Sequence, residues 1–331
     1  MRALVTGGLG FVGRWLTAHL EDEGDDVTAV DAETDVTDEE AVERAMEASQ
    51  PDAVYHLAAR AHVGESWRDP LGVLRVNVLG TAAVLAAARR GAPEATVLVV
   101  SSAEVYGALA PEELPVGEGA RLRPSTPYAA SKAAAEQVAI QAWLGYGQRA
   151  VVVRPFNHVG PGQSPNFAVP ALARRVLEAR RDGSRELVVG TVTTRRDFTD
   201  VRDVVRAYRL LVARAEPGEV YNVCSGNDVA IADVVARLMA LTGVELRMVT
   251  DPELVRPVDT PVLRGDPSRL VAATGWAPAI PLDETLRDVL SDLGRGEEEG
   301  LVRGEEAGLV RGEEDGLGRK APGGQPPGVA R

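Results

Sequence analysis

The segment Thr6-Gly7-Gly8-Leu9-Gly10-Phe11-Val12-Gly13 decides how the N-terminal half of this chain folds. It follows the apolar run 2–6, which we expect to be a buried strand, and it leads into a helical pattern over 13–23. In such a unit Gly7 permits a tight turn, Gly10 lets a pyrophosphate approach the backbone, and Gly13 lets the helix pack on the strand. The helix N-terminus offers amide donors and a favourable dipole to phosphates. We therefore assign Gly7, Gly10, Phe11, Val12 and Gly13 to a dinucleotide site.

The first half of the chain alternates apolar runs with Ala-rich amphipathic stretches. The pattern predicts strands over 2–6, 27–31, 53–57, 96–101 and 150–154, and helices over 13–23, 39–49, 73–90 and 128–145. Asp38 is the expected N-cap of the helix over 39–49. This alternation predicts an α/β fold with a doubly wound parallel sheet, the Rossmann arrangement, covered by helices on both faces.

Beyond Pro155 the pattern loosens, which we interpret as a smaller α/β lobe that binds the substrate. Pro161, Pro165 and Pro170 interrupt a loop at its start. The elements expected after this loop are helices over 171–181, 201–215, 231–242 and 282–293 and strands over 186–189 and 220–223. We divide the chain into a mainly dinucleotide-binding domain (1–155), a mainly substrate-binding lobe (156–293) with some segments returning to the first domain, and a tail (294–331).

The tail repeats an eight-residue unit that begins at Gly296, Gly304 and Gly312 and is rich in Gly and Glu. Such a unit cannot bury much apolar surface, so we expect the tail to be disordered. A tail that binds a partner protein is the alternative.

Composition restricts the partners and the location of the protein. The net charge of -13 over 331 residues argues against nucleic acid or an anionic membrane as the main partner. The single cysteine, Cys224, excludes an intramolecular disulfide and fits the reducing cytoplasm. No run of about 20 apolar residues predicts a membrane helix. The four histidines do not cluster with Cys or carboxylates at ligand spacings, so we expect no metal site.

An acidic residue at the end of the second expected strand bears on the choice of cofactor. The Asp31 carboxylate is placed to bind both ribose hydroxyls of NAD, and it would repel the 2′-phosphate of NADP. NAD(H) is therefore slightly favoured, while NADP(H) stays open. Asp35 and Val36 follow closely and are candidates for contacts to the adenine. The alternative for Asp35 is a loop acid that caps the next helix.

Tyr128 and Lys132 lie four residues apart in a helical segment, so both side chains face the same way. A lysine ammonium near a phenol lowers the pKa of the phenol and allows proton exchange near neutral pH. Hydride transfer to or from a carbonyl carbon needs such a partner for the carbonyl oxygen. Together with the glycine segment, the pair predicts an NAD(P)-dependent oxidoreductase.

Several further motifs give the chain, from about residue 1 to 292, a resemblance to the extended short-chain dehydrogenase/reductase family. Members of this family mostly act on nucleotide sugars. The motifs are TGGLGFVG (6–13), HLAA (56–59), RVNVLGT (75–81), SSAEVYG (101–107), PYAASK (127–132), RPFNHVGPGQ (154–163), RRDFTDVRDVVRA (195–207) and NVCSG (222–226).

The resemblance implies roles for individual residues. Ser102, Tyr128 and Lys132 would form a catalytic triad in which Ser102 hydrogen-bonds the substrate oxygen. Further cofactor contacts would come from Leu57, Ala58, Ala59, Asn77 and Pro155. The family also implies a homodimer that forms through two helices of each subunit, near 73–90 and 128–145.

Within the family, the second-lobe motifs are most similar to the branch that handles GDP-linked sugars of the GDP-mannose pathway. Two reactions compete there. One is NAD(P)H-dependent reduction of the 4-keto group of a GDP-4-keto-6-deoxy sugar, which gives a GDP-6-deoxyhexose such as GDP-D-rhamnose. The other is 4,6-dehydration of GDP-mannose, for which dehydratases carry a glutamate matching Glu104. Ala103 stands here where those enzymes have Asp or Ser, which favours the reductase and keeps Glu104 as a candidate catalytic residue.

Two other classes are weighed behind these. A sugar 4-epimerase shares the SSAEVYG pattern, but it usually has a longer segment before the acid on the adenine side than the close spacing of Asp31 and Asp35 allows. A dinucleotide-binding regulatory protein typically lacks the Tyr or the Lys, and this chain retains both.

The nucleotide diphosphate of the expected GDP-sugar requires cations and polar groups. Arg196 and Arg256 are candidates because a guanidinium engages phosphate oxygens in a fork. Asn157 is expected to donate to a phosphate or sugar oxygen, and Asp259 resembles the acid that binds the ribose. His158 and Cys224 are given structural roles. Trp67 and Arg68 are weaker candidates near the sugar.

Overall fold

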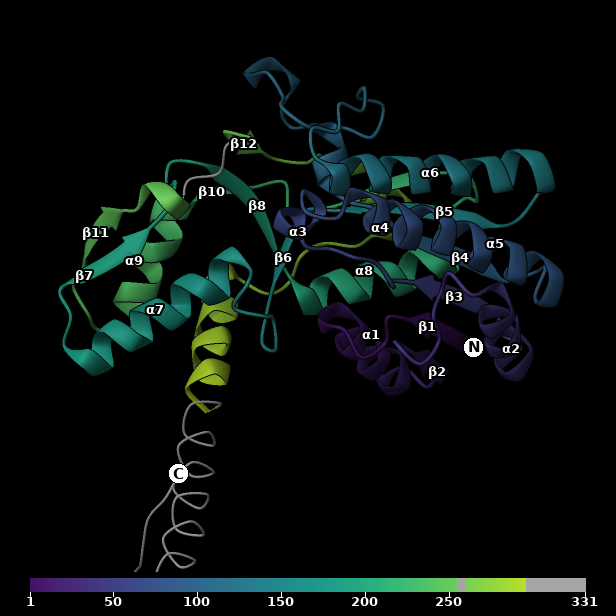
Figure 1. Cartoon of the computed structure of the whole chain (residues 1–331), viewed down its shortest axis with the longest axis horizontal. Helices are drawn as coiled ribbons and strands as arrows, with labels where there is room; N and C mark the ends of the chain where they lie inside the picture. Colours follow the sequence, from purple (N-terminus) through teal and green to yellow (C-terminus); the bar gives the residue numbers. More distant parts are fainter. Residues whose placement is uncertain (255–259, 296–331) are drawn as a thin grey trace, which may run out of the picture.

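Six parallel strands form the central sheet of the larger lobe in a computed structural model that describes residues 1–254 and 260–295. From one edge to the other they are β2 (Asp26–Val30), β1 (Arg2–Thr6), β3 (Ala53–His56), β4 (Thr96–Val100), β5 (Ala150–Pro155) and β9 (Val220–Val223). The inner strands are almost continuously apolar and buried, as expected when both faces of a parallel sheet are covered. The predicted doubly wound sheet is confirmed (Figure 1).

Helices cover the two faces of this sheet with separate apolar clusters. On one face, α1 (Phe11–Asp22) and α8 (Val201–Arg214) pack against the strands through residues such as Leu16 and Val204. On the other face lie α2 (Glu39–Ser49), α5 (Gly80–Gly91) and α6 (Pro127–Tyr146). Asp38 caps α2 as predicted, because its carboxylate accepts the backbone N–H groups of Glu40 and Ala41.

One helix in the described part of the chain, Pro70–Gly91, is long and apolar enough to cross a membrane by length and composition. It consists of α4 (Pro70–Leu74), a π-helical turn (Arg75–Leu79) and α5. Half of its most apolar window is buried inside the protein, where α5 belongs to the core beneath the sheet. Core helices of globular proteins pass the same test, and we interpret this helix as one of them.

The smaller lobe contains two short sheets and its own core. Strands β10 (Asp228–Ala230), β8 (Arg195–Asp200) and β12 (Val262–Leu263) pair side by side, β6 (Asn157–Val159) also pairs with β8, and β11 (Arg247–Thr250) pairs with β7 (Glu186–Val189). Helices α7 (Ala168–Asp182), α9 (Ile231–Thr242) and the helix over 282–295 pack around an apolar cluster that includes Leu238 and Leu286. The lobe is the left part of Figure 1.

Two details of the smaller lobe differ from expectation. Helix α7 begins at Ala168, so Pro170 lies in its first turn, where the missing N–H costs nothing. Strands β6, β8, β10, β11 and β12 were not expected, and neither was helix α10 (Ser268–Thr274), which packs on the larger lobe.

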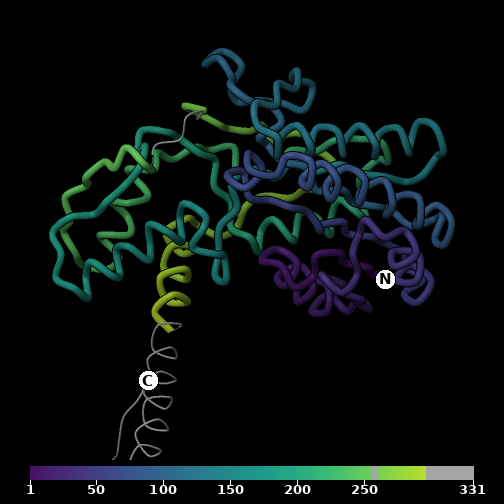
Figure 2. The backbone as a smooth tube through the Cα atoms, viewed as in Figure 1, coloured from purple at the N-terminus to yellow at the C-terminus, as the bar shows by residue number. Residues whose placement is uncertain are grey.

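The chain crosses between the lobes more than once, as the tube in Figure 2 shows. After β8 it returns to the larger lobe, where α8 lies on the sheet and β9 pairs with β5 in parallel. Helix α10 and the buried Trp276 also join this core. The division at residue 155 therefore remains an interpretation of composition rather than a boundary between two continuous segments.

Candidate functional site

The glycine segment forms a tight cradle between β1 and α1. Gly7 has φ +73°, and a Cβ placed on it would lie 2.8 Å from the backbone N of Ala58, at the end of β3. A Cβ on Gly13 would lie 2.1 Å from the carbonyl oxygen of Gly7, so α1 approaches the turn closely only because Gly13 has no side chain. Both positions match the roles predicted for them.

The N-terminus of α1 is left open to an anion. No side chain in the described part of the chain caps this end, and its first turn carries no acid. Arg14 is the first residue whose N–H bonds back along the helix, to the Gly10 carbonyl. The preceding amides of Phe11, Val12 and Gly13 are those that a helix start leaves unpaired. The cradle therefore fits the pyrophosphate of a dinucleotide, which these amides and the helix dipole would hold.

Asp31 lies beside this cradle, as predicted. Its Oδ2 accepts the backbone N–H of Leu9 within the glycine segment at 2.8 Å, and its Oδ1 accepts that of Ala32 at 2.9 Å. The carboxylate thus stands at the edge of the turn that forms the cradle.

The neighbouring Asp35 makes contacts of a different kind. Its Oδ1 accepts both the N–H and the hydroxyl of Thr37 at 2.8 Å, and these bonds lower the pKa of the carboxyl. Val36 is buried against Gly80 of α5. These contacts favour the alternative in which Asp35 stabilises its own loop.

A buried polar chain joins the cofactor side of the sheet to α6. Thr6 and His56 meet at 2.8 Å (Oγ1 to Nδ1), His56 and Thr81 at 3.1 Å (Nε2 to Oγ1), and the Thr81 hydroxyl donates to the Asn77 carbonyl at 2.6 Å. Burial lowers the pKa of His56 to about 3, so the ring is neutral. The sequence places His56 in the HLAA motif but does not predict this chain of hydrogen bonds, since its members come from four separate elements.

Asn77 continues the chain to the catalytic helix. It lies in the π-helical turn, a local irregularity that is frequent at functional sites. Its Nδ2 donates to the Ser131 hydroxyl at 2.8 Å, and that hydroxyl donates to the Tyr128 carbonyl at 2.7 Å. The Asn77 Oδ1 accepts the backbone N–H of Arg60 at 2.8 Å. Asn77 therefore ties the loop after β3, where Leu57, Ala58 and Ala59 lie, to the first turn of α6.

Ser102 and Glu104 stand together just beyond β4. Ser102 caps the 3-10 turn Ala103–Tyr106, and its Oγ accepts the backbone N–H of Glu104 at 3.2 Å. The intervening Ala103 is buried. The Glu104 carboxylate is close enough to Tyr128 to disfavour ionisation of the phenol.

Tyr128 and Lys132 are buried one turn apart on α6, whose N-cap is Thr126. Tyr128 shares a hydrogen bond with the Ser102 side chain, and Lys132 donates from Nζ to the Val100 carbonyl at the end of β4 at 2.7 Å. The structure therefore brings Ser102, Tyr128, Lys132 and Glu104 together where β4 and α6 meet.

The pKa of Tyr128 differs from the expectation that Lys132 lowers it. Burial raises the pKa of Tyr128 to about 12, and the Ser102 hydrogen bond opposes this shift without cancelling it. Lys132 is not among the groups that shift this pKa, and its own pKa falls to about 8 through burial. Its ammonium is engaged with the Val100 carbonyl instead. The phenol is consequently protonated at neutral pH, the state a proton donor requires.

The residues expected to bind the nucleotide are partly placed. Asn157 is exposed on β6, and Arg196 lies on the neighbouring β8, where its Nη1 donates to the carbonyls of Arg195 and Thr260 at 2.9 and 2.7 Å. Pro155 ends β5 between the lobes. Arg256 and Asp259 lie outside the described residues.

Strand β6 and the segment after it pack against the first turns of α1. The His158 ring stacks on Phe11 with centroids 6.1 Å apart, and the Trp15 Nε1 donates to the Pro161 carbonyl at 3.0 Å. His158 thus has the structural role expected of it, as does the buried Cys224. Trp15, four residues after Phe11 on α1, was not predicted. Trp67 is 56% exposed and Arg68 is also exposed, beside the short helix α3 (Val63–Ser66).

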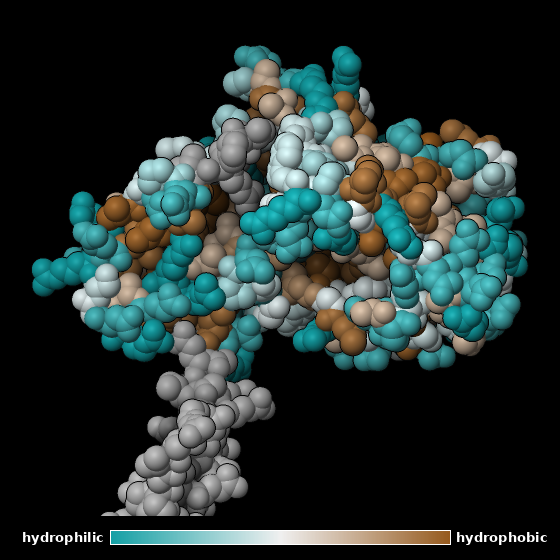
Figure 3. Space-filling model, viewed as in Figure 1, coloured by the Kyte–Doolittle hydropathy of each residue, from teal (hydrophilic) through white to brown (hydrophobic). Residues whose placement is uncertain are grey.

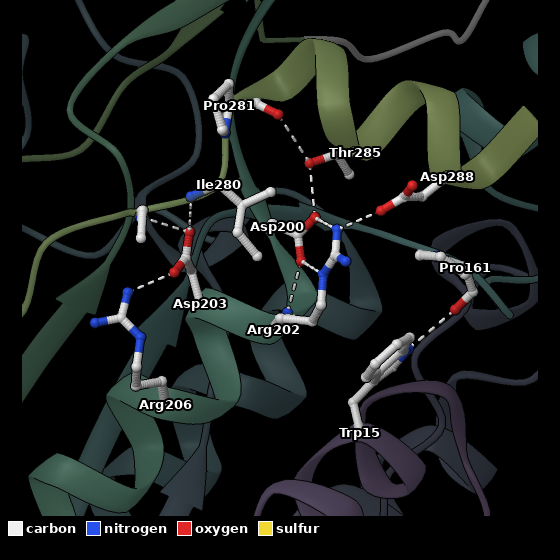
Figure 4. Close-up of polar contacts among 11 residues, drawn as sticks. Trp15, Pro161, Asp200, Arg202, Asp203, Arg206, Ile280, Pro281, Thr285 and Asp288 are labelled. Carbon is white, nitrogen blue, oxygen red and sulfur yellow. Dashed lines mark hydrogen bonds and ion pairs between the residues drawn. The ribbon is translucent and has the colours of Figure 1, made fainter.

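Ion pairs fix the helix over 282–295 next to this segment (Figure 4). Arg202, at the start of α8, bonds Asp200 through two nitrogens at 2.8–2.9 Å and reaches Asp288 of that helix at 2.7 Å. The Thr285 hydroxyl also donates to Asp200, at 2.6 Å. In the space-filling view the surface is hollowed between the regions of α1 and α3, with apolar side chains in the hollow (Figure 3).

Comparison with known proteins gives consistent matches over most of the chain. Residues 3–224 match the NAD dependent epimerase/dehydratase family. The GDP-6-deoxy-D-mannose reductase of Pseudomonas aeruginosa is 38% identical over 294 residues, which cover 88% of this chain and 96% of the relative.

Solved structures resemble the fold at similar coverage. RMD from Pseudomonas aeruginosa, complexed with NADPH, superposes with a TM-score of 0.82 at 37% identity and covers 88% of this chain and 99% of its own. UDP-glucose 4-epimerase from Thermus thermophilus, in complex with NAD, gives a TM-score of 0.80 at 31% identity, with the same two coverages.

Proposed function

This chain belongs to the NAD dependent epimerase/dehydratase family, and from that premise we propose that it reduces the 4-keto group of a GDP-4-keto-6-deoxy sugar with NAD(P)H. That it is an NAD(P)-dependent enzyme that modifies nucleotide sugars follows from the family and its relatives. The product would be a GDP-6-deoxyhexose such as GDP-D-rhamnose. The likeness to a GDP-6-deoxy-D-mannose reductase over 96% of that relative's length supports the choice of reaction.

The observation that carries the proposal is the protonated, buried phenol of Tyr128 beside the Ser102 hydroxyl. The bound cofactor would supply hydride to the carbonyl carbon. Ser102 polarises the carbonyl oxygen by a hydrogen bond, and Tyr128 gives that oxygen its proton. The Lys132 ammonium donates to the Val100 carbonyl and so holds the strand end that precedes Ser102. The phenol is protonated at neutral pH, so it has a proton to give to the substrate oxygen.

Dehydration of GDP-mannose is the second candidate, and Glu104 is the observation that favours it. This carboxylate lies close enough to Tyr128 to act on its pKa, where a base for the C5 proton would be useful. The adjacent Ala103 is buried and has no polar group to assist loss of the C6 hydroxyl. Reduction needs no such group, which is why we place it first.

One experiment separates the candidates. The purified protein is incubated with GDP-mannose alone and, separately, with GDP-4-keto-6-deoxymannose and either NADH or NADPH. With the ketosugar, we expect the absorbance of the reduced cofactor to fall. With GDP-mannose alone, we expect no ketosugar to form. Formation of ketosugar without added reductant would replace the proposal with the dehydratase, and no turnover in either arm would favour a regulatory dinucleotide-binding protein.

A Tyr128→Phe variant tests the proton donor within the same assay. Removing the hydroxyl should lower kcat by about 10²- to 10⁴-fold, the range that a general acid contributes. Binding of the reduced cofactor, followed by its fluorescence, should change little, because the glycine cradle is untouched. Wild-type turnover in this variant would show that another group protonates the substrate oxygen.

We also propose that the enzyme acts as a homodimer through one exposed apolar face, which we call the α4–α6 face. It comprises Leu71, Leu74 and Leu79 of the helix over 70–91 and Leu144 and Tyr146 of α6, which are 39–77% exposed. Apolar side chains gather on this part of the surface in Figure 3. Monomeric proteins rarely expose contiguous apolar patches of this kind, and a second copy of the same face would cover it.

A further inference from the structure

A buried ion pair lies one helical turn beyond Lys132. The Glu136 side chain is fully buried on α6, and that of Arg154 on β5 is 5% exposed. Two parallel bonds join them, from Nε to Oε1 at 2.9 Å and from Nη2 to Oε2 at 2.8 Å. Because desolvating such a pair offsets most of its attraction, stability alone explains its presence poorly.

The pair is bonded to the strand end that carries the catalytic serine. The Ser101 hydroxyl donates to Glu136 Oε1. The residue before it, Val100, accepts the Lys132 ammonium through its carbonyl, and the residue after it is Ser102. Helix α6 therefore bonds the last residue of β4 through Lys132 and the residue that follows it through Glu136.

Arg154 extends this support to the turn after Ser102. Its Nη1 donates to the Tyr106 hydroxyl at 2.9 Å and to the Glu118 carbonyl at 3.0 Å. The Tyr106 hydroxyl donates to Asn222 Oδ1 of β9 at 2.6 Å. Tyr106 ends the 3-10 turn that also holds Glu104. Both flanks of Ser102 are thus anchored to one ion pair.

Glu136 also acts on the charge of Lys132. Burial lowers the pKa of Lys132, and the Glu136 carboxylate opposes that shift. Together with burial, the ammonium in turn lowers the pKa of the neutral His56 on β3, and Glu136 itself is paired with Arg154. Glu136 is the nearby acid that favours the ammonium form.

We propose that Glu136, paired with Arg154, is a positioning residue that holds Ser102 and Lys132 in catalytic register. Its carboxylate also favours the charged form of Lys132. The inference rests on the proposed function, because it assigns Glu136 a part in the same proton transfer. It assigns Glu136 no contact with the substrate or the cofactor. Glu136 acts on the position of Ser102 through its hydrogen bond with the preceding residue, Ser101.

The sequence offers a direct test, because Lys132 and Lys320 are the two lysines of the chain. Protein labelled with ¹³C at the lysine Cε positions should give two signals, which Lys132→Met assigns. A pH titration then reports the protonation of Lys132 without substrate or turnover, with Lys320 as the internal reference. Glu136→Gln should lower the Lys132 midpoint, which is about 8 in the native protein, by about one pH unit.

Turnover provides the second measurement. Glu136→Gln should lower kcat at least tenfold, with a smaller change in KM, and move the alkaline limb of the kcat profile to lower pH in step with the NMR midpoint. Ser101→Ala keeps the carboxylate and removes the link, so it should lower kcat several-fold and leave the midpoint in place. Asp25→Asn is the matched control, since Asp25 is a buried carboxylate paired with Arg209 away from α6.

The outcomes separate this inference from the proposed function. An unshifted Lys132 midpoint in Glu136→Gln, or the same shift in Asp25→Asn, overturns it whatever the substrate is. If Glu136→Gln does not fold, the Ser101→Ala variant tests the inference instead. A wild-type kcat in that variant refutes the role of Glu136 as a positioning residue. If the midpoint shifts as expected but no ketosugar is reduced, the inference on Lys132 stands and the proposed reaction fails.

Discussion

At the scale of single residues, burial decides how the candidate catalytic groups behave. Tyr128 and Lys132 lose water on entering the junction of β4 and α6, which raises the pKa of the phenol to about 12 and lowers that of the amine to about 8. The phenol is thus held as an acid and the amine stays near its titration point. Asp31, by contrast, stands at the partly exposed edge of the cofactor cradle.

Asp31 should influence the choice of cofactor. In Asp31→Asn the negative charge beside the ribose is gone, so kcat/KM with NADPH should rise relative to NADH by about tenfold, equivalent to about 1.4 kcal/mol. Steady-state kinetics with both cofactors measures this ratio. Asp35→Asn is the control, because that carboxylate faces Thr37, and it should leave the ratio unchanged. An equal effect of both substitutions would mean that Asp31 does not itself set the preference between NADH and NADPH.

His56 should make the fold sensitive to acid. Its pKa is about 3 in the folded protein and about 6.5 when unfolded, so the unfolded state binds a proton that the folded state refuses. The protonation of His56 does not reduce the free energy of unfolding above pH 6.5, and it reduces it progressively as the pH falls from 6.5 toward 3. The contribution of His56 to the free energy of unfolding changes by up to about 1.4 kcal/mol per pH unit in this range. Urea denaturation at several pH values between 6 and 4.5 gives the free energy of unfolding as a function of pH. In His56→Asn this dependence on pH should be weaker by up to that amount, and an unchanged dependence would contradict the assignment.

At the scale of elements, the functional groups lie where strands end and helices begin. The cradle joins β1 to α1, the serine follows β4, and the tyrosine lies in the first turn of α6. This placement follows from the parallel sheet, since the carboxyl ends of all its strands meet at one edge. The π-helical turn at 75–79 adds an irregularity that presents Asn77 to α6.

The close contact of α1 with the turn gives a prediction at this scale. In Gly13→Ala the new Cβ would meet the Gly7 carbonyl at 2.1 Å, so the helix start must move away from the cradle. We expect a loss of about 1–3 kcal/mol in the free energy of unfolding and a large loss of cofactor affinity. Gly117→Ala, with nothing within 4 Å of its Cβ, is the control and should remain within about 0.5 kcal/mol of wild type. Tight NADPH binding by Gly13→Ala would rule out the glycine cradle as the site that holds the pyrophosphate of the cofactor.

At the scale of the whole molecule, two lobes meet across the candidate site, and one broad apolar face is left outside it. The smaller lobe is linked to the larger by the crossing segments around β6 and β8 and by the ion pairs of Arg202. The α4–α6 face lies on the larger lobe in Figure 3. Its helices also carry Asn77, Tyr128 and Lys132 on their inner sides, so a dimer there would stiffen the elements that bear the site.

The dimer is testable by charge insertion. Leu71→Glu combined with Leu79→Glu places two charges on the α4–α6 face, where they would be buried without partners, so the protein should become monomeric. Light scattering should then give one chain of 35.0 kDa in place of two. Val188→Glu, on an exposed apolar residue of β7 in the smaller lobe, should leave the mass unchanged. A wild-type monomer would end the proposal.

The sequence by itself determined the Rossmann sheet, its covering helices, the glycine cradle and the Tyr128–Lys132 pair. These depend on short-range signals, namely apolar periodicity, glycine spacing and the four-residue turn of a helix. Their bounds were predicted within a few residues, and β1, α2, β7, β9 and α9 were predicted to the residue.

Only the tertiary structure decided the remainder. Strand β8 has the sequence RRDFTD, whose charges are satisfied by partners such as Asp228 and Ser225, far along the chain, and no periodicity predicts it. The raised pKa of Tyr128 required knowledge of its burial, and the bond from Ser101 to Glu136 joins residues 35 positions apart. Hydrogen bonds and desolvation act through space, so the arrangement around Lys132 was settled by packing rather than by its motif.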